Sequence, residues 1–184
     1  LPKNSLSYDD AIAFADDRQP KNNSDYCDEK LNDIQFRLPQ DYEWQIASRC
    51  QYNWDTNLCG EYLDYPINIE GDNAIPSCNF INYRGQGCCD CVKAVDQYPE
   101  SITPFGLYGT SGNLQEWVVN NNSSTENFKL IGGFWLSTSN QIKTTSVYYF
   151  PDDPIYNEVG DVSFGLRTVI DANVFLEIWR DCVD

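Results

Sequence analysis

The first regular element that the pattern of apolar positions predicts is a short amphipathic helix near the start of the chain. Ser7 and Asp10 have the spacing of a capping box, in which the two side chains satisfy backbone N–H groups of the first helical turn. Apolar side chains then recur at helical spacing along one face: Tyr8, Ala11, Ile12 and Ala15. We expect this face to be buried.

A second helix is expected over residues 39–49. Pro39 presets a helical backbone angle, and Asp41 and Glu43 place negative charge in the first turn, where the helix dipole stabilises it. Residues 50–101 then show no sustained period of either kind and hold six of the eight cysteines. This stretch predicts loops held by disulfides rather than regular structure.

After Tyr108 the pattern changes to short runs of β-branched and aromatic residues, which are typical of strands separated by turns. The predicted strands are residues 117–119, 130–136, 146–150, 164–170 and 174–179. There is no internal repeat and no long linker, so we expect a single domain over residues 1–184.

Charge and composition narrow the range of partners. The chain has 12 Lys and Arg against 28 Asp and Glu, a formal net charge of −16, so nucleic acids and anionic membranes would be repelled. Histidine is absent, which removes imidazole bases and His-ligated metal sites. The longest apolar run, residues 11–15, is far short of the roughly 20 residues that cross a bilayer. We expect no nucleic-acid partner and no membrane insertion.

The eight cysteines favour disulfides and hence an oxidising compartment, although their pairing stays open. A zinc site is the rival interpretation, with four closely spaced ligands: Cys78, Cys88, Cys89 and Cys91. Asn22, Asn121 and Asn122 each begin an N-glycosylation acceptor motif, as in a secreted glycoprotein. Met is absent, so we expect residue 1 to follow processing or to lie inside a longer protein.

Several short motifs follow one another along the chain. They are Leu-Ser-Tyr-Asp-Asp-Ala at residues 6–11, Phe-Arg-Leu-Pro at 36–39, Glu-Trp at 43–44, Ala-Ser-Arg at 47–49, Phe-Gly-Leu-Tyr at 105–108, Gly-Asn-Leu-Gln-Glu-Trp at 112–117, Gly-Gly-Phe-Trp at 132–135 and Phe-Gly-Leu-Arg at 164–167. In this order they resemble the formylglycine-generating enzyme family, also called the sulfatase-modifying factor family, over about residues 2–170.

The resemblance implies an α+β fold, a variant of the C-type-lectin-like fold. Two helices would pack on small twisted antiparallel sheets, with long loops stapled by disulfides. The usual N-terminal strands of the family and its Met-Gly-Ser segment have no counterpart here. We therefore expect either a trimmed fold or a chain that is part of a longer one.

The oxidase activity of that family depends on two cysteines that hold copper(I) as thiolates shortly after the Gly-Gly motif. Counted from Gly132 and Gly133, those positions are Ser137 and Ile142, and neither side chain can supply a thiolate. The resemblance therefore implies a pseudoenzyme without copper. Iron-dependent sulfoxide synthases of the same superfamily use histidine, which is absent here. A carboxylate-based hydrolase or oxidoreductase is the enzyme alternative.

Calcium is the metal that the resemblance implies, since carboxylate and carbonyl oxygens are its ligands. One structural site would use the carbonyls of Gly109, Gly112 and Leu114 with the side chain of Glu116. A second would lie near Asn79, Phe80 and Asp90. The alternative at the first site is a carboxylate that accepts from neighbouring N–H groups without metal. The sugar-binding calcium motifs of true C-type lectins are absent, so calcium would be structural.

The segment between Gly132-Gly133 and Phe164-Gly165 is the candidate ligand surface. Its Tyr, Ser, Asn and Asp content is similar to that of an antibody paratope. The candidate ligand-binding residues are Trp135, Ser137, Asn140, Tyr148, Tyr149, Asp152, Tyr156 and Asn157. In the same fold, variable proteins of diversity-generating retroelements place their diversified residues here. The alternative is an ordinary strand with alternate side chains in the core.

Together these features favour a secreted, non-catalytic binding or assembly protein with a protein or glycan ligand and partners among other chains. A retroelement-diversified receptor-binding protein is the first alternative. An enzyme that uses carboxylates on the same scaffold is the second.

Overall fold

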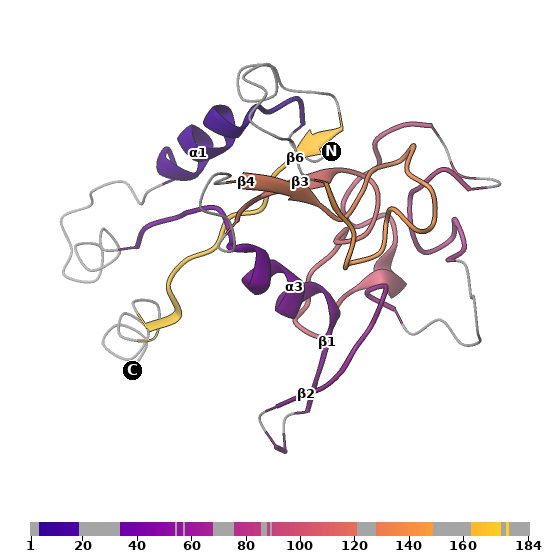
Figure 1. Cartoon of the computed structure of the whole chain (residues 1–184), viewed down its shortest axis with the longest axis horizontal. Coiled ribbons are helices and arrows are strands. Elements are labelled where there is room, and N and C mark those ends of the chain that lie inside the picture. Colours follow the sequence, from indigo (N-terminus) through magenta and orange to yellow (C-terminus); the bar gives the residue numbers. More distant parts are fainter. Residues whose placement is uncertain are drawn as a thin grey trace.

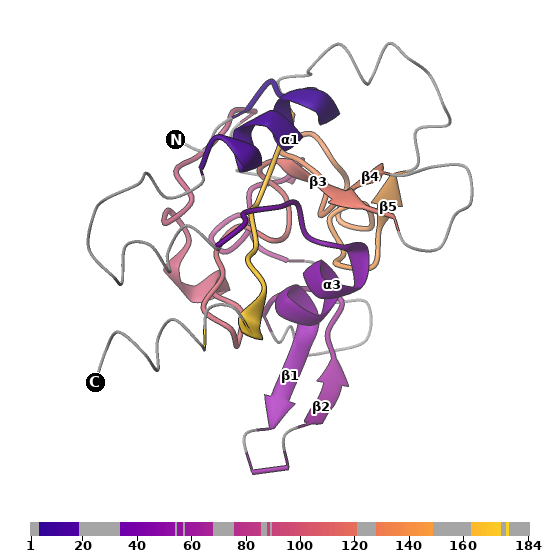
Figure 2. The same cartoon turned by 90° about the vertical axis from the view of Figure 1, so that its left-hand side faces the viewer.

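The computed structural model describes residues 4–18, 34–53, 55–56, 58–67, 76–85, 88, 90–120, 128–148, 163–173 and 176. Its elements are α1 (Tyr8–Asp16), α3 (Asp41–Arg49), β1 (Cys50–Asn53), β2 (Leu58–Tyr62), the 3₁₀ helix η1 (Pro99–Ser101), β3 (Gln115–Val119), β4 (Phe128–Ile131), β5 (Val147–Tyr148) and β6 (Phe164–Gly165). The strands form a two-stranded sheet, β1-β2, and a four-stranded sheet in the order β5-β4-β3-β6. Helices α1 and α3 lie on opposite sides of β3 and β4 (Figures 1 and 2).

Helix α1 begins where the capping box predicts it. The Ser7 hydroxyl accepts from the backbone N–H of Asp10, and the Asp10 carboxylate accepts from that of Ser7, both at 3.1 Å. Ala11 and Ala15 are buried as expected, whereas Ile12 is 38% exposed. The prediction for Ile12 is wrong because the small alanines form the line of closest contact and leave Ile12 at its margin.

Helix α3 begins at Asp41, two residues later than predicted. Gln40 is extended and forms a parallel bridge with Val119, while the Val119 N–H donates to the Pro39 carbonyl at 2.9 Å. This pairing with β3 keeps Pro39 and Gln40 out of the helix. The Glu43 carboxylate then caps the helix by accepting from the Gln40 N–H at 2.8 Å.

The four-stranded sheet divides the core into two layers. On one face, Trp117 and Leu130 pack with Ala11 of α1 and Phe164, and on the other, Val118 and Ile131 pack with Trp44 of α3. The alternation along β3 and β4 is that of strands buried on both faces. Strand β6 runs parallel to β3, so the sheet is mixed and the expectation of antiparallel sheets is corrected.

The predicted strand 130–136 is shorter and lies earlier, as β4. Gly132 and Gly133 adopt φ values of +88° and +68°, which end the strand in a turn. The predicted strand 164–170 is regular only at β6, after which Val169 forms a single bridge with Arg37. In the predicted strand 174–179, the described residue Leu176 is helical, and the other positions lie outside the described residues.

A β-hairpin, β1-β2, occupies part of the region that was predicted to be loop. It projects from the body of the molecule (Figure 2) and has an irregular register between Gln51 and Tyr52. Leu58 and Tyr62 are 65% and 50% exposed. A hairpin without a well-buried face has no apolar alternation, which is why the pattern did not reveal it.

The cysteines that the structure describes are in disulfides, and none of them is free. Cys50 pairs with Cys59 across the hairpin, Cys78 pairs with Cys88, and Cys91 is also disulfide-bonded. The disulfide prediction is confirmed for these residues. The zinc alternative is wrong, because sulfurs bonded to each other are not available as thiolate ligands.

Candidate functional site

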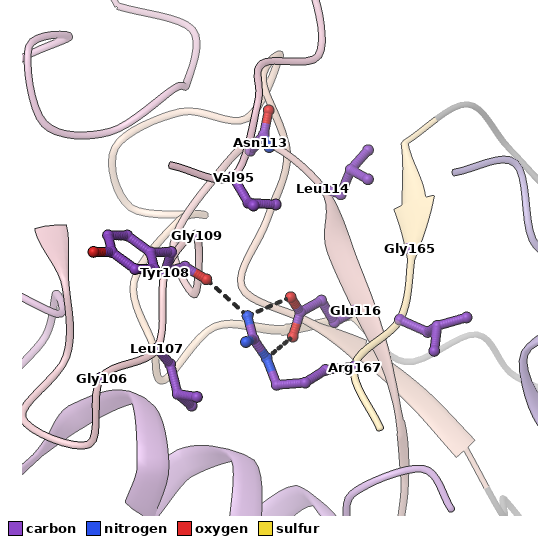
Figure 3. Close-up of a pocket in the computed structure, with 11 residues that line it drawn as sticks. Val95, Gly106, Leu107, Tyr108, Gly109, Asn113, Leu114, Glu116, Gly165 and Arg167 are labelled. Carbon is purple, nitrogen blue, oxygen red and sulfur yellow. Dashed lines mark hydrogen bonds and ion pairs between the residues drawn. The ribbon is translucent and has the colours of Figure 1, made fainter. Parts of the chain in front are cut away.

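The motif Gly-Asn-Leu-Gln-Glu-Trp places Glu116 at the centre of an ion-pair network on β3 (Figure 3). Arg167, just after β6, donates to both oxygens of the Glu116 carboxylate, from Nε at 3.0 Å and from a terminal nitrogen at 2.8 Å. The Trp44 indole N–H donates to the same carboxylate at 2.6 Å. Arg167 also donates to the Tyr108 carbonyl at 2.9 Å. The Glu116–Arg167 pair thus joins the sheet, α3 and the 105–109 loop.

Tyr108, Glu116 and Arg167 of this network line a cavity of about 270 Å³ between the 106–109 loop, β3 and the chain after β6. Figure 3 shows Arg167 and Glu116 pointing toward each other beside Tyr108. The side chain of Glu116 is 10% exposed and that of Arg167 is 22% exposed. Since a bidentate pair satisfies both groups in place, the cavity presents little unbalanced charge.

The loop before β3 is shaped by residues in the left-handed backbone region. Asn113 has φ +64° and Gly112 has φ +68°. A Cβ on Gly112 would lie 2.2 Å from the carbonyl oxygen of Asn82. Asn82 in turn donates to the Cys91 carbonyl at 2.8 Å and to the Asn113 side chain at 3.0 Å. Close backbone approach here therefore requires the glycine that the motif supplies.

The predicted calcium ligands are only partly brought together. Gly109, Leu114 and Glu116 line the same cavity, and Gly112 is not among the described residues that line it. Calcium takes about six to eight oxygen ligands. The only charged donor of the proposed set is shared between a guanidinium and an indole, so this set does not fit the ion. The alternative, a carboxylate that accepts from neighbouring N–H groups, describes Glu116 as the structure shows it.

The second predicted calcium region contains a buried side-chain oxygen that was not among the predicted ligands. Asn79 and Asp90 are exposed and Phe80 is half-buried. Asn82, which the sequence reasoning missed, is 1% exposed, and its side-chain oxygen has no partner among the described residues. The described residues contain no cluster of three or more acidic, His or Cys side chains that could hold a metal. Calcium at this place stays a prediction.

Ser137 and Ile142, at the positions counted for the copper ligands of the family, are both buried. Ser137 is 1% exposed, and its hydroxyl accepts from the Phe134 N–H at 3.0 Å. Ile142 is 0% exposed and packs with Tyr65, Ile81 and Tyr83. The Ile142 side chain therefore belongs to a hydrophobic cluster, and the Ser137 hydroxyl stabilises the turn that contains it.

The predicted ligand surface is only partly a surface. Trp135 and Ser137 are buried, so they cannot contact a ligand directly, and the prediction is wrong for these two side chains. Asn140 is exposed, as predicted. Thr138, which belongs to the same candidate segment, is exposed as well, and the sequence reasoning missed one exposed neighbour in this turn, Leu136. Exposed and buried positions alternate here as they would in a strand, although these residues form a turn.

The rest of that prediction lies where the structure gives little or no description. The backbone of Tyr148, in β5, pairs with that of Leu130 in β4, and the Tyr148 side chain is not described. Tyr149, Asp152, Tyr156 and Asn157 lie outside the described residues, as do the acceptor asparagines Asn22, Asn121 and Asn122.

A second cavity, of about 380 Å³, lies between α3, the 105–107 loop and residues 167–169. Glu43 lines it and forms a bidentate pair with Arg37, both contacts at 2.7 Å. The hydrogen bond from Arg37 holds the pKa of Glu43 below its ordinary value. A general acid at neutral pH needs a raised pKa, so Glu43 is poorly suited to that role.

Two helices, a small mixed sheet and loops that carry the motifs in the order given above together define a protein of the formylglycine-generating-enzyme type. The chain belongs to the FGE-sulfatase family, whose sulfatase-modifying factor enzyme 1-like domain matches residues 1–172. The resemblance drawn from the motifs is thereby confirmed. A search of curated proteins gave no match.

Solved structures share the fold at low sequence identity. The structure of PvdO from Pseudomonas aeruginosa is 16% identical with a TM-score of 0.63, covering 93% of this chain and 62% of that one. Treponema denticola variable protein 1 is 18% identical with a TM-score of 0.57, covering 91% and 70%. The crystal structure of CarF is 16% identical with a TM-score of 0.58, covering 90% and 65%. The chain thus spans less than two thirds of PvdO and of CarF.

Two features bear on the compartment. The described part of the chain contains disulfides, which form and persist in oxidising surroundings. Among its helices, none combines the length and the apolar character that a membrane crossing needs.

Proposed function

We propose that this chain is a non-catalytic binding or assembly protein that uses the formylglycine-generating-enzyme scaffold in an oxidising, extracellular environment. Its ligand is a protein or a glycan, bound over the exposed turn residues that follow the Gly-Gly motif. The observation that carries the proposal is the burial of Ser137 and Ile142 at the positions of the copper ligands. A hydroxyl and a hydrocarbon cannot hold copper(I), which requires soft sulfur donors.

The acidic side chains beside the cavities support the same proposal. Glu116 is held by Arg167, and Glu43 is held by Arg37. A carboxylate-based hydrolase needs one acid with a raised pKa beside a second acid. Both of these carboxylates instead stabilise the scaffold through ion pairs.

The catalytic alternative is tested with copper(I) and oxygen. The oxidised chain is titrated with copper(I) in the presence of a competing chelator, and oxygen uptake is followed with a thiol reductant and a cysteine-containing peptide. We expect no tight binding and no uptake above that of the buffer. Stoichiometric copper with turnover would overturn the proposal.

The binding surface is tested with a protein and glycan array, followed by variants of the captured chain. Leu136 is 44% exposed on the proposed surface, and Leu58, 65% exposed on the distant hairpin, is its matched control. For a binder taken from the array, Leu136→Ala should weaken affinity about tenfold, whereas Leu58→Ala should not. Equal effects of the two substitutions would contradict the assignment of this surface.

A retroelement-diversified variable protein is the second candidate. Its support is the shared fold with Treponema denticola variable protein 1. Sequencing the locus in related isolates would test it. Substitutions concentrated within residues 134–163 would favour it, and changes spread evenly along the chain would count against it.

A further inference from the structure

A polar cavity of about 460 Å³ lies next to the turn that carries Ser137. Two segments far apart in the chain form it, and the lining side chains that matter are Ser77, Cys78, Tyr83, Arg84, Thr138 and Ser139. Its volume is within the range of small-molecule sites. Neither the network around Glu116 nor the predicted calcium residues take part in it.

The wall that carries Arg84 is held in place on several sides. Cys78 is bonded to Cys88, and the Tyr83 hydroxyl donates to the Pro76 carbonyl. The Arg84 N–H donates to the Ser137 carbonyl at 2.9 Å, which ties this segment to the proposed ligand surface. A Cβ on Gly85 would lie 2.7 Å from the Tyr83 ring. The backbone of Arg84 is therefore preorganised, while its side chain is exposed.

The charged side chain that the structure describes in this cavity is opposite in sign to the net charge of the chain. The chain has a net charge of −16, yet the described residues that line the cavity include Arg84 and no acidic residue. Four other cations of the described residues are in ion pairs: Arg37, Lys129, Lys143 and Arg167. Among the residues that the structure describes, no carboxylate lies within ion-pair distance of Arg84. An uncompensated guanidinium in a polar cavity favours an anionic ligand group.

We infer that this cavity binds a sugar unit that carries a carboxylate, such as a uronic acid. The planar guanidinium of Arg84 matches a carboxylate through two parallel N–H donors. Three hydroxyls line the cavity. That of Thr138 donates to the Gln141 side chain and can still accept, that of Ser77 accepts from the Asn79 N–H and can still donate, and that of Ser139 adds a third group with the chemistry to bond sugar hydroxyls. The inference rests on the proposed function, because Thr138 and Ser139 belong to the proposed ligand surface, and it specifies the chemical class of the ligand.

The test is a titration of the full oxidised chain followed by ¹H–¹⁵N NMR at constant ionic strength. The probes are glucuronate, glucose as its neutral analogue, and acetate as a carboxylate without the sugar. We expect glucuronate to shift the signals of Arg84 and Ser139, with glucose and acetate each at least about tenfold weaker, since charge-assisted and neutral hydrogen bonds both contribute. Acetate binding as tightly as glucuronate would overturn the inference.

Matched variants separate the site from general charge effects. Arg84→Gln should weaken glucuronate binding about tenfold or more, and Arg84→Lys should restore only part of it, because ammonium lacks the planar fork. Lys93→Gln removes the same charge away from the cavity and should leave binding unchanged. Since the Arg84 side chain is exposed, thermal unfolding of Arg84→Gln and Arg84→Lys should match that of the wild type. Equal binding by the wild type and Arg84→Gln would overturn the inference.

The failure of this inference and that of the proposed function can be told apart. An array binder that depends on Leu136 and is indifferent to Arg84→Gln would overturn the sugar-acid site and leave the binding function in place. Copper-dependent oxygen uptake would overturn the non-catalytic function and leave the glucuronate result unchanged.

Discussion

The Glu116–Arg167 pair shows how one carboxylate can connect several elements of the fold. The carboxylate accepts from Arg167 and from the Trp44 indole, and it connects β3 with α3 and with the chain after β6. Removing one partner of a poorly hydrated pair leaves the other charge uncompensated, which costs more than the pair contributes when intact. Glu116 is therefore a residue at which the scaffold is sensitive to a change of charge.

Glu116→Gln should lower the free energy of unfolding by about 2–4 kcal/mol, because the guanidinium of Arg167 is left facing an amide. Glu43→Gln is the matched control, since it breaks another bidentate pair with arginine. Its side chains are 28% and 41% exposed, and we expect a loss of about 1 kcal/mol or less. Urea unfolding of the two variants measures the difference. Equal losses would show that the burial of the Glu116 pair has no energetic weight.

Among the elements, the loop that leads into β3 depends most on backbone conformation. Gly112 combines a positive φ with a close approach to the Asn82 carbonyl, whereas Gly106, at φ +80°, has open space where a Cβ would lie. The two glycines thus separate the cost of conformation from the cost of collision. The loop positions both Asn113 and the start of the strand that carries Glu116.

Gly106→Ala should cost about 1–2 kcal/mol, the price of a side chain in the left-handed region. Gly112→Ala adds a collision with backbone atoms and should cost more than about 4 kcal/mol, or prevent folding altogether. Expression level and thermal unfolding of the two variants measure the contrast. Similar melting temperatures would mean that the 110–114 loop adapts to a methyl group.

For the whole molecule, disulfides offset a core that is split into small clusters. One cluster lies between α1 and the sheet, a second between α3 and the sheet, and a third around Ile142 in the loops. Small separate cores contribute less than one continuous core, so covalent constraint of the unfolded chain becomes important. This agrees with the proposal of an oxidising environment.

Removing the hairpin disulfide by Cys50→Ala with Cys59→Ala should cost about 2–3 kcal/mol, through the gain in entropy of the unfolded chain. The melting temperature should fall by roughly 5–10 °C in differential scanning calorimetry. The double variant Cys78→Ala with Cys88→Ala is the matched comparison. Its loss of stability should be similar, because the two disulfides close loops of similar length, with separations of 9 and 10 residues. A double variant as stable as the wild type would show that the crosslink constrains nothing.

Local chemistry was enough to predict both helices and the strand at Trp117, since capping and periodicity involve only neighbouring residues. The positions of Ser137 and Ile142 as sites without a thiol came from the resemblance to the family. Packing alone decided that Arg167 would meet Glu116 across 51 residues, that Trp135 would be buried and that β6 would run parallel to β3. Such contacts depend on how distant segments are brought together, which no short window of sequence contains. The polar cavity at Arg84 belongs to the same group, because its two walls come from segments more than fifty residues apart.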